Sequence, residues 1–165
     1  MAGVNNHNLR LRIKSLFLFA GLFIFIASRP WIAMQNYNRG QTYISCKVYD
    51  RAESQFKKAL FLMPGFTRCY ESLGYMYEDL GRYEDAISVY KTSLSYDPRN
   101  STAYFRIGFY YAYVKKDYLK ALQWFYKAYY FSPDDRLVIN WIGICYQKLG
   151  LTDAAREYYS KIKQF

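Results

Sequence analysis

Small and aromatic residues recur along the chain with a period of 34 or 35 residues. In each period a glycine is followed three positions later by a tyrosine, and a later alanine is followed four positions on by an aromatic residue. The four series are Gly40, Gly74, Gly108 and Gly143; Tyr43, Tyr77, Tyr111 and Tyr146; Ala52, Ala86, Ala121 and Ala155; and Phe56, Tyr90, Phe125 and Tyr159. Residues three or four apart lie on one face of a helix, so every period predicts two helices, each with an apolar stripe.

Turn residues mark where these helices begin and end. The first three periods close on Pro64, Pro98 and Pro133. Glycine turns inside periods lie at residues 80–82 and 149–151, and polar turns between periods lie at 96–101 and 132–135. Asn100 or Ser101 can cap the helix that follows, and Thr152 can cap the last helix.

This periodicity predicts an all-α fold. The small residues let an antiparallel partner helix approach closely, and the aromatic residues fill the space that remains. Two helices of this kind cannot bury their apolar faces alone, so neighbouring pairs must stack into a solenoid. A solenoid presents an extended surface, which indicates a binding protein rather than an enzyme.

The periods resemble the tetratricopeptide repeat family. Residues 70–77, continued through Ala86, Tyr90 and Pro98, match its pattern closely. The other units depart from it: the first is degenerate, with Arg39 where an apolar residue is usual, the third has one extra residue, and the fourth lacks a closing proline. The resemblance implies a right-handed superhelix of four repeats, at about 33–66, 67–100, 101–135 and 136–165.

The resemblance also implies a binding surface, because the first helix of each pair lines the concave groove in this family. The matching positions are Tyr37, Glu71, Tyr75, Phe105, Arg106, Phe109, Tyr113, Asn140, Trp141 and Ile144. Such an aromatic groove suits an apolar or amphipathic helix or an extended peptide. The alternative is that these aromatics serve packing between repeats and contacts of the convex side with other subunits. The Lys, Asn and Arg clamp that holds chaperone tails is matched only at Arg106, which disfavours that subtype.

The N-terminal part has a different composition. The chain carries a net charge of +10, and its first 49 residues contain six basic residues and no acidic one. A basic tail at 1–12 precedes an apolar run at 16–27, which predicts a membrane-anchor helix and interface over 13–34. The anchor residues are Leu16, Phe17, Phe19, Phe23, Ile24, Phe25 and Trp31. Twelve helical residues cover only about 18 Å against roughly 30 Å of hydrocarbon, so the anchor must extend beyond the run.

Two alternatives to a retained anchor are a cleaved signal peptide and a buried soluble helix. For a single-pass anchor the basic residues favour a cytoplasmic N-terminus, which places the repeats on the extracytoplasmic, periplasmic side. A mitochondrial or plastid membrane is the alternative, since the leader is basic and free of acids.

The sequence offers few residues that could serve catalysis or hold a cofactor or metal. The one histidine, His7, lies in the N-terminal tail, so we expect no catalytic, cofactor or metal site in the repeats. Cys46, Cys69 and Cys145 lie in first helices and are expected to be small core residues without a disulfide. Nucleic acid is an unlikely partner, because basic residues alternate with acidic ones through the repeats.

The sequence therefore predicts a non-enzymatic, membrane-anchored scaffold whose partners are the lipid bilayer and protein subunits of a membrane complex. The alternative is a self-assembling protein, since the last repeat ends in residues 158–165 without a polar capping helix. An apolar end face there could stack on a second copy and give a homo-oligomer.

Overall fold

The computed structural model describes the backbone of residues 3–162; within α1, the side chains of residues 3–13, 15, 17, 18, 20, 22, 24 and 25 lie outside the description. The regular secondary structure of this described part is all helical, and it contains no strand. Its elements are α1 (Gly3–Ser45), α2 (Tyr49–Leu62), α3 (Thr67–Asp79), α4 (Tyr83–Tyr96), α5 (Ser101–Phe109), η1 (Tyr110–Val114), α6 (Tyr118–Phe131), α7 (Arg136–Lys148) and α8 (Thr152–Ile162).

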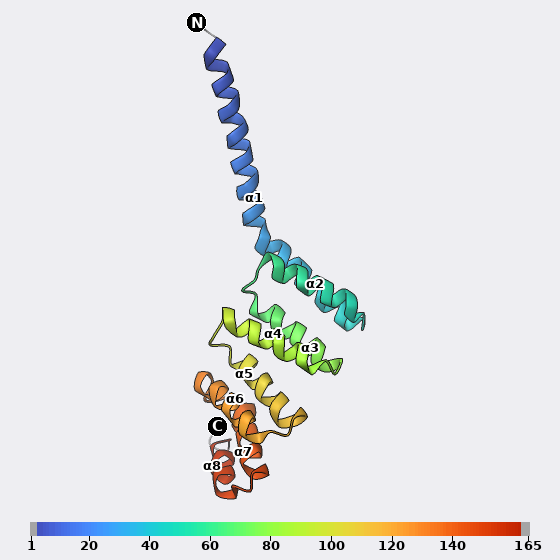
Figure 1. The fold of residues 1–165 in the computed structure, drawn as a ribbon, viewed down its shortest axis with the longest axis vertical. Coiled ribbons are helices and arrows are strands. Elements are labelled where there is room, and N and C mark those ends of the chain that lie inside the picture. The colour runs from blue at the N-terminus through green and yellow to red at the C-terminus, as the bar shows by residue number, and fades with distance from the viewer. Residues whose placement is uncertain (1–2, 163–165) are drawn as a thin grey trace.

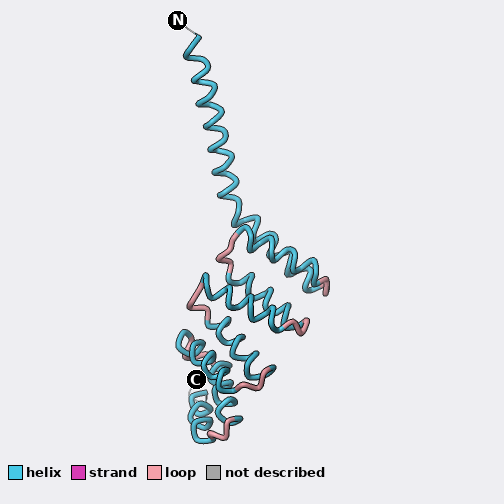
Figure 2. The backbone as a smooth tube through the Cα atoms, in the orientation of Figure 1, coloured by secondary structure: helices cyan, strands magenta, loops and turns pink. Residues whose placement is uncertain are grey.

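The helices form four pairs that stack one below another in an elongated solenoid (Figure 1). Each first helix, α1, α3, α5 or α7, packs mainly on the second helix that follows it in the chain. The prediction of an all-α solenoid of four helix pairs is confirmed, and the pairs follow the expected repeat boundaries closely. The N-terminal part of α1 projects away from the stack (Figure 2).

Close contact between the two helices of a pair depends on the periodic glycines. A Cβ atom placed on Gly40 would lie 2.6 Å from the ring of Phe56, and one on Gly108 would lie 2.7 Å from the ring of Phe125. Tyr90 fills the same place opposite Gly74. The rings of Phe56, Tyr90 and Phe125 are completely buried, so the predicted partnership of small and aromatic residues is confirmed.

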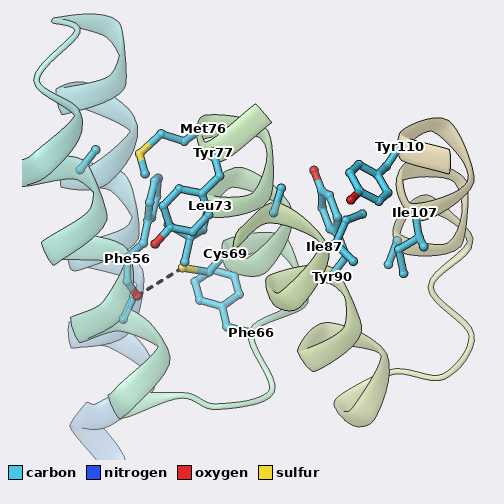
Figure 3. Packing of buried hydrophobic residues seen from close by; sticks show 14 residues of the cluster. Phe56, Phe66, Cys69, Leu73, Met76, Tyr77, Ile87, Tyr90, Ile107 and Tyr110 are labelled. Carbon is cyan, nitrogen blue, oxygen red and sulfur yellow. Dashed lines mark hydrogen bonds between the residues drawn. The ribbon is translucent and has the colours of Figure 1, made fainter. Parts of the chain in front are cut away.

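The core extends from one pair into the next in two buried clusters. Figure 3 shows Phe56 of α2, Leu73 and Tyr77 of α3, Tyr90 of α4 and Ile107 of α5 in one buried cluster. A second cluster continues it below, around Phe125, Val138, Ile142 and Cys145. Each helix pair is therefore stabilised by its neighbours, as the repeat pattern requires.

The cysteines lie in two different environments. Cys69 and Cys145 are buried, which raises the pKa of both thiols to about 12. Cys69 donates a hydrogen bond to the Phe56 carbonyl oxygen at 3.6 Å. Cys46 is exposed, so its assignment to the core was wrong, because α1 ends at Ser45 and Cys46 begins the turn. All three cysteines are free thiols.

The turns between the two helices of a repeat share one backbone feature in all four repeats. A left-handed residue stands at its centre: Lys47 (φ 57°), Gly81 (φ 70°), Lys116 (φ 57°) and Gly150 (φ 78°). The spacing is 34 residues except between Gly81 and Lys116, where it is 35. The extra residue of the third repeat therefore lies before Lys116, and the helix absorbs it as the π-helical turn η1.

Helix caps agree with the turn signals in part. The Asn100 side chain accepts a hydrogen bond from the backbone N–H of Ala103 at 3.0 Å and caps α5. Asp117 and Asp135 cap α6 and α7 in the same way. Thr152 is the first residue of α8 rather than a residue preceding it.

The first helix is continuous from Gly3 to Ser45, with Pro30 inside it. Residues 3–12, expected to be a tail, therefore belong to α1. Its packed part begins near Ala33, which is completely buried, whereas the described apolar side chains before it are mostly exposed, with Leu16 at 70% and Phe23 at 73%. The side chains of Phe17, Ile24 and Phe25, named as anchor residues, lie outside the described residues. No helix in the part that the structure describes is both long and apolar enough to cross a membrane.

Candidate protein-binding face

The ten residues predicted to line a groove lie on α1, α3, α5, η1 and α7, and we call this surface the first-helix face. Tyr113 is exposed to 55%, and the other nine side chains are half-buried. None is sequestered in the core, so the repeat pattern places them at the surface. Their contacts differ from one end of the face to the other.

At the N-terminal end the predicted residue serves packing between repeats. The Tyr37 ring lies between Phe56 and Phe66, with ring centroids 5.9 and 5.0 Å away. The Gln41 side-chain amide donates hydrogen bonds to Tyr37 Oη at 2.7 Å and to Ser72 Oγ at 2.8 Å. These bonds join α1 to α3, and they leave Tyr37 with little freedom to contact a partner.

In the middle of the face a charged pair links the second repeat to the third. The Arg106 guanidinium lies 4.1 Å from the Tyr75 ring centroid and donates a hydrogen bond to Glu78 at 3.2 Å. Burial raises the pKa of Glu78, and the positive charge of Arg106 opposes that shift without cancelling it. Glu71, also predicted, accepts a hydrogen bond from the Asn100 amide at 2.9 Å. This section is polar and already internally paired.

The C-terminal half of the face is aromatic. Phe109 stacks on Tyr113 with a centroid distance of 5.2 Å and meets the edge of Trp141 at 5.0 Å. Phe105 extends the group, with its ring 6.4 Å from that of Phe109. These four rings come from α5, η1 and α7, so the structure brings together residues that lie 36 positions apart in the chain, as Phe105 and Trp141 do.

Two further predicted residues complete this half. Asn140 and Ile144 flank Trp141 on α7 and are half-buried. Lys116, which sequence reasoning missed, places its ammonium group 4.9 Å from the Tyr113 ring centroid. The sequence did contain an indication of this residue. The extra residue of the third repeat predicts a changed helix end just before Lys116.

This aromatic half can bind an apolar or amphipathic segment of another protein. Offset rings that expose one face provide apolar contact area at a low cost in conformational entropy. Lys116 lies beside the Tyr113 ring and can attract an acidic residue of the bound segment.

The described residues give little support for a metal site. Among them, no group of three or more His, Cys, Asp or Glu side chains is placed to hold a metal ion. The acidic pairs near the Gly81 turn make ion pairs instead, such as Arg82 with Asp85 at 2.7 Å and Lys115 with Glu84 at 3.3 Å.

The last repeat was expected to leave an apolar end face over residues 158–165, of which 163–165 lie outside the described residues. Tyr158 turns inward, where its hydroxyl donates a hydrogen bond to Tyr126 Oη at 3.1 Å and its ring packs on Tyr146. Tyr159 covers Gly143. The exposed side chains of α8 are Thr152, Asp153, Arg156, Glu157 and Ser160. This polar surface shields the end of the solenoid, as capping repeats do.

Comparisons with known proteins agree with this architecture. Models described as tetratricopeptide repeat match residues 37–94 and 138–164, and one described as TPR repeat matches residues 74–115. No curated protein matches the chain.

Solved structures of similar shape include a crystal structure of MamA, with 22% identity, a TM-score of 0.70, and coverage of 78% of this chain and 75% of that chain. Another is MamA, from residue 41 to its end, from Desulfovibrio magneticus RS-1, with 20% identity, a TM-score of 0.67, and coverage of 80% and 74%. At these identities the likeness shows the fold.

The fold and the first-helix face define an α-solenoid repeat protein. The chain belongs to the tetratricopeptide repeat family, as three repeat models that span both its N-terminal and C-terminal pairs establish.

Proposed function

We propose that this protein is a non-enzymatic, membrane-anchored scaffold that holds protein subunits of a larger membrane complex. The observation that carries the proposal is the aromatic half of the first-helix face. Phe109, Tyr113 and Trp141 form one group at the surface, and Tyr113 remains 55% exposed although it is a large ring. An exposed aromatic group lowers the solubility of a protein and is typical of a surface that binds a partner.

The projecting part of α1 supports membrane association. Residues 3–28 would extend about 39 Å as a helix, which exceeds the roughly 30 Å thickness of the hydrocarbon layer. Four described side chains there, Leu16, Phe19, Phe23 and Ile26, are each more than half exposed. Exposed apolar side chains on a projecting helix are costly in water and favourable in lipid. With a cytoplasmic N-terminus the repeats would lie on the extracytoplasmic, periplasmic side; a mitochondrial or plastid membrane is the alternative.

The test is purification of the full chain from native membranes in a mild detergent, followed by mass spectrometry of the proteins that co-migrate. Stoichiometric membrane subunits are the expected result. Recovery of the chain alone, as a homo-oligomer, would contradict the scaffold and favour self-assembly.

A double variant, Phe109→Ala with Tyr113→Ala, tests the face itself. It should reduce the yield of co-purified subunits at least tenfold, because hot-spot aromatics each contribute about 2 kcal/mol or more. The matched control is Tyr96→Ala with Tyr130→Ala, which removes two exposed rings from second helices. An unchanged yield from a folded Phe109→Ala, Tyr113→Ala variant would exclude the first-helix face as the binding surface.

A further inference from the structure

We propose that the end of the first repeat is a docking surface for anionic phospholipid headgroups. The surface, which we call the basic collar, consists of Arg29, Trp31, Lys57, Lys58 and Phe61. The inference rests on the proposed membrane association of α1. It adds a second membrane contact, made by the repeat domain, and it names the chemistry of the lipid.

The collar surrounds the point where α1 leaves the solenoid. Because α2 runs antiparallel to α1, its C-terminal end lies beside this point (Figures 1 and 2). The Arg29 guanidinium donates a hydrogen bond to the Phe61 carbonyl oxygen at 3.4 Å, which ties the two helices together there. A surface pocket of about 450 Å³ opens next to this contact, lined by Asn36, Lys57, Lys58, Phe61 and Leu62.

Two aromatic rings of the collar are exposed without a structural reason. Phe61 is 80% exposed and Trp31 is 67% exposed, so neither contributes much to the core. Trp is favoured at the boundary between lipid and water, where its ring meets the headgroups. Both rings lie at the end of the apolar run at 16–27, where such a boundary would fall if that run entered the bilayer.

The charge of the collar is positive. No acidic residue occurs in residues 1–49 or between Glu53 and Glu71. Lys57 is paired with Glu53 at 2.6 Å, but Arg29 and Lys58 make no ion pair within the described part of the chain. Unpaired cations beside exposed rings are complementary to an anionic headgroup surface, which attracts each of them by about 1 kcal/mol.

The equivalent edges of later repeats differ. Phe61 corresponds to Ser95 in the second repeat and to Tyr130 in the third, and Lys58 corresponds to Lys127 in the third. Although Tyr130 is also 78% exposed, the turn after it carries Asp134 and Asp135, which an anionic surface would repel. Among the first three repeats, only the edge next to the apolar helix is followed by a turn without an acidic residue, at 63–66, so the charge of this edge differs from that of the next two repeats.

Lysine acetylation of the full chain in vesicles tests the proposal. The chain is reconstituted in phosphatidylcholine vesicles and in vesicles with about a third of that lipid replaced by phosphatidylglycerol. Acetylation rates at Lys58 and Lys127 are then read by mass spectrometry. We expect Lys58 to react about fivefold more slowly on the anionic vesicles, and Lys127 to react equally on both.

Matched variants locate the effect. Lys57, the neighbour of Lys58 in the collar, should also be protected on anionic vesicles. Lys58→Gln with Phe61→Ser should abolish this protection of Lys57, whereas Lys127→Gln with Tyr130→Ser, changes at the equivalent positions, should leave it intact. Equal protection of Lys57 in both variants would overturn the proposal. So would protection of Lys58 in detergent solution by inorganic phosphate or by polyglutamate, since either would indicate a small-anion or acidic-peptide site.

Flotation and an alkaline wash separate this inference from membrane anchoring. If the chain floats with both vesicles and resists the wash, but Lys58 reacts equally on both, the collar is overturned and the anchor stands. If the chain is washed off yet Lys58 is protected on anionic vesicles, docking stands and insertion of α1 fails. A chain that does not float with either vesicle overturns both.

Discussion

Gly74 lies where α3 contacts the ring of Tyr90, and a Cβ atom at this position would overlap that ring. Two effects of the substitution Gly74→Ala oppose each other. Alanine favours a helix interior by roughly 0.5 to 1 kcal/mol over glycine. Forcing a methyl group against a completely buried ring costs about 1 to 3 kcal/mol, because the surrounding core cannot move away easily. We expect the steric cost to dominate and the free energy of unfolding to fall.

Chemical denaturation of the full chain in detergent measures this change, with Gly65→Ala as the control. Gly65 has no atom within 4 Å of a Cβ position, so alanine there should change the free energy of unfolding by less than about 0.5 kcal/mol. If Gly74→Ala were as stable as wild type, the periodic glycines would not be needed for helix contact.

At the scale of the element, the turn inside each repeat offers a sharper test. Gly81 has a φ of 70°, a conformation in which a Cβ atom approaches the following carbonyl oxygen. Gly81→Ala should therefore lower the free energy of unfolding by about 1 kcal/mol. Lys116 already carries a Cβ atom at a φ of 57°, so Lys116→Ala adds no such strain and should change stability by less than about 0.5 kcal/mol. Equal losses in the two variants, measured by thermal unfolding, would contradict this account.

The sequence predicted the elements well where side-chain size alone decides the structure. The glycine and aromatic series gave the helix pairs, and the prolines and Asn100 gave their boundaries. Backbone conformations were harder to predict. Nothing in their side chains marks Lys47 and Lys116 as left-handed residues, since lysine has no intrinsic preference for that region. Likewise, Pro30 removes only one backbone donor, and α1 continues through it, so the expected tail at residues 3–12 belongs to the same helix as the residues of the anchor.

The surface position of the candidate residues could be predicted and their contacts could not, and their role in binding stays a prediction. All ten residues lie at the surface of first helices, because family spacing determines which face a position occupies. Which rings meet depends on η1, whose π-helical turn follows from a single extra residue. Tyr37 shows the limit most clearly. Its contacts with Phe56 and Phe66 lie within its own repeat, its link to the next repeat runs through Gln41 and Ser72, and neither could be deduced from spacing.

Across the whole molecule, stability depends on the interfaces between successive repeats as much as on each repeat. Arg106 and Glu78 form one such link, between α5 and α3, with 29% and 17% of their side chains exposed. Arg106→Leu leaves the Glu78 carboxylate without its cation in a mostly dry position. We expect the free energy of unfolding at neutral pH to fall by about 2 kcal/mol, reduced from the value for full burial because water reaches part of the pair.

Arg82→Leu is the matched control. Arg82 also lies over a tyrosine ring, 4.3 Å from the Tyr77 centroid, and pairs with Glu53 at 3.1 Å. Glu53 keeps Lys57 as a partner at 2.6 Å in this variant, and Asp85, which loses its ion pair with Arg82, is 51% exposed and stays solvated by water. The loss should be smaller than that of Arg106→Leu, because Arg82 and Asp85 are each about half exposed to water.

The pH dependence distinguishes loss of the charge pair from loss of packing. Burial raises the pKa of Glu78 above its ordinary value of 4.5. The folded state therefore binds this proton more tightly than the unfolded state, and the contribution of Glu78 to stability falls as the pH rises through the interval between the two values. Without Arg106 the pKa of Glu78 should rise further, which extends the interval upward. The deficit of Arg106→Leu relative to wild type should thus shrink as the pH falls from neutral. A deficit that stays constant between neutral and acidic pH, in denaturant titrations of both proteins, would assign the effect of Arg106 to its packing on Tyr75 instead.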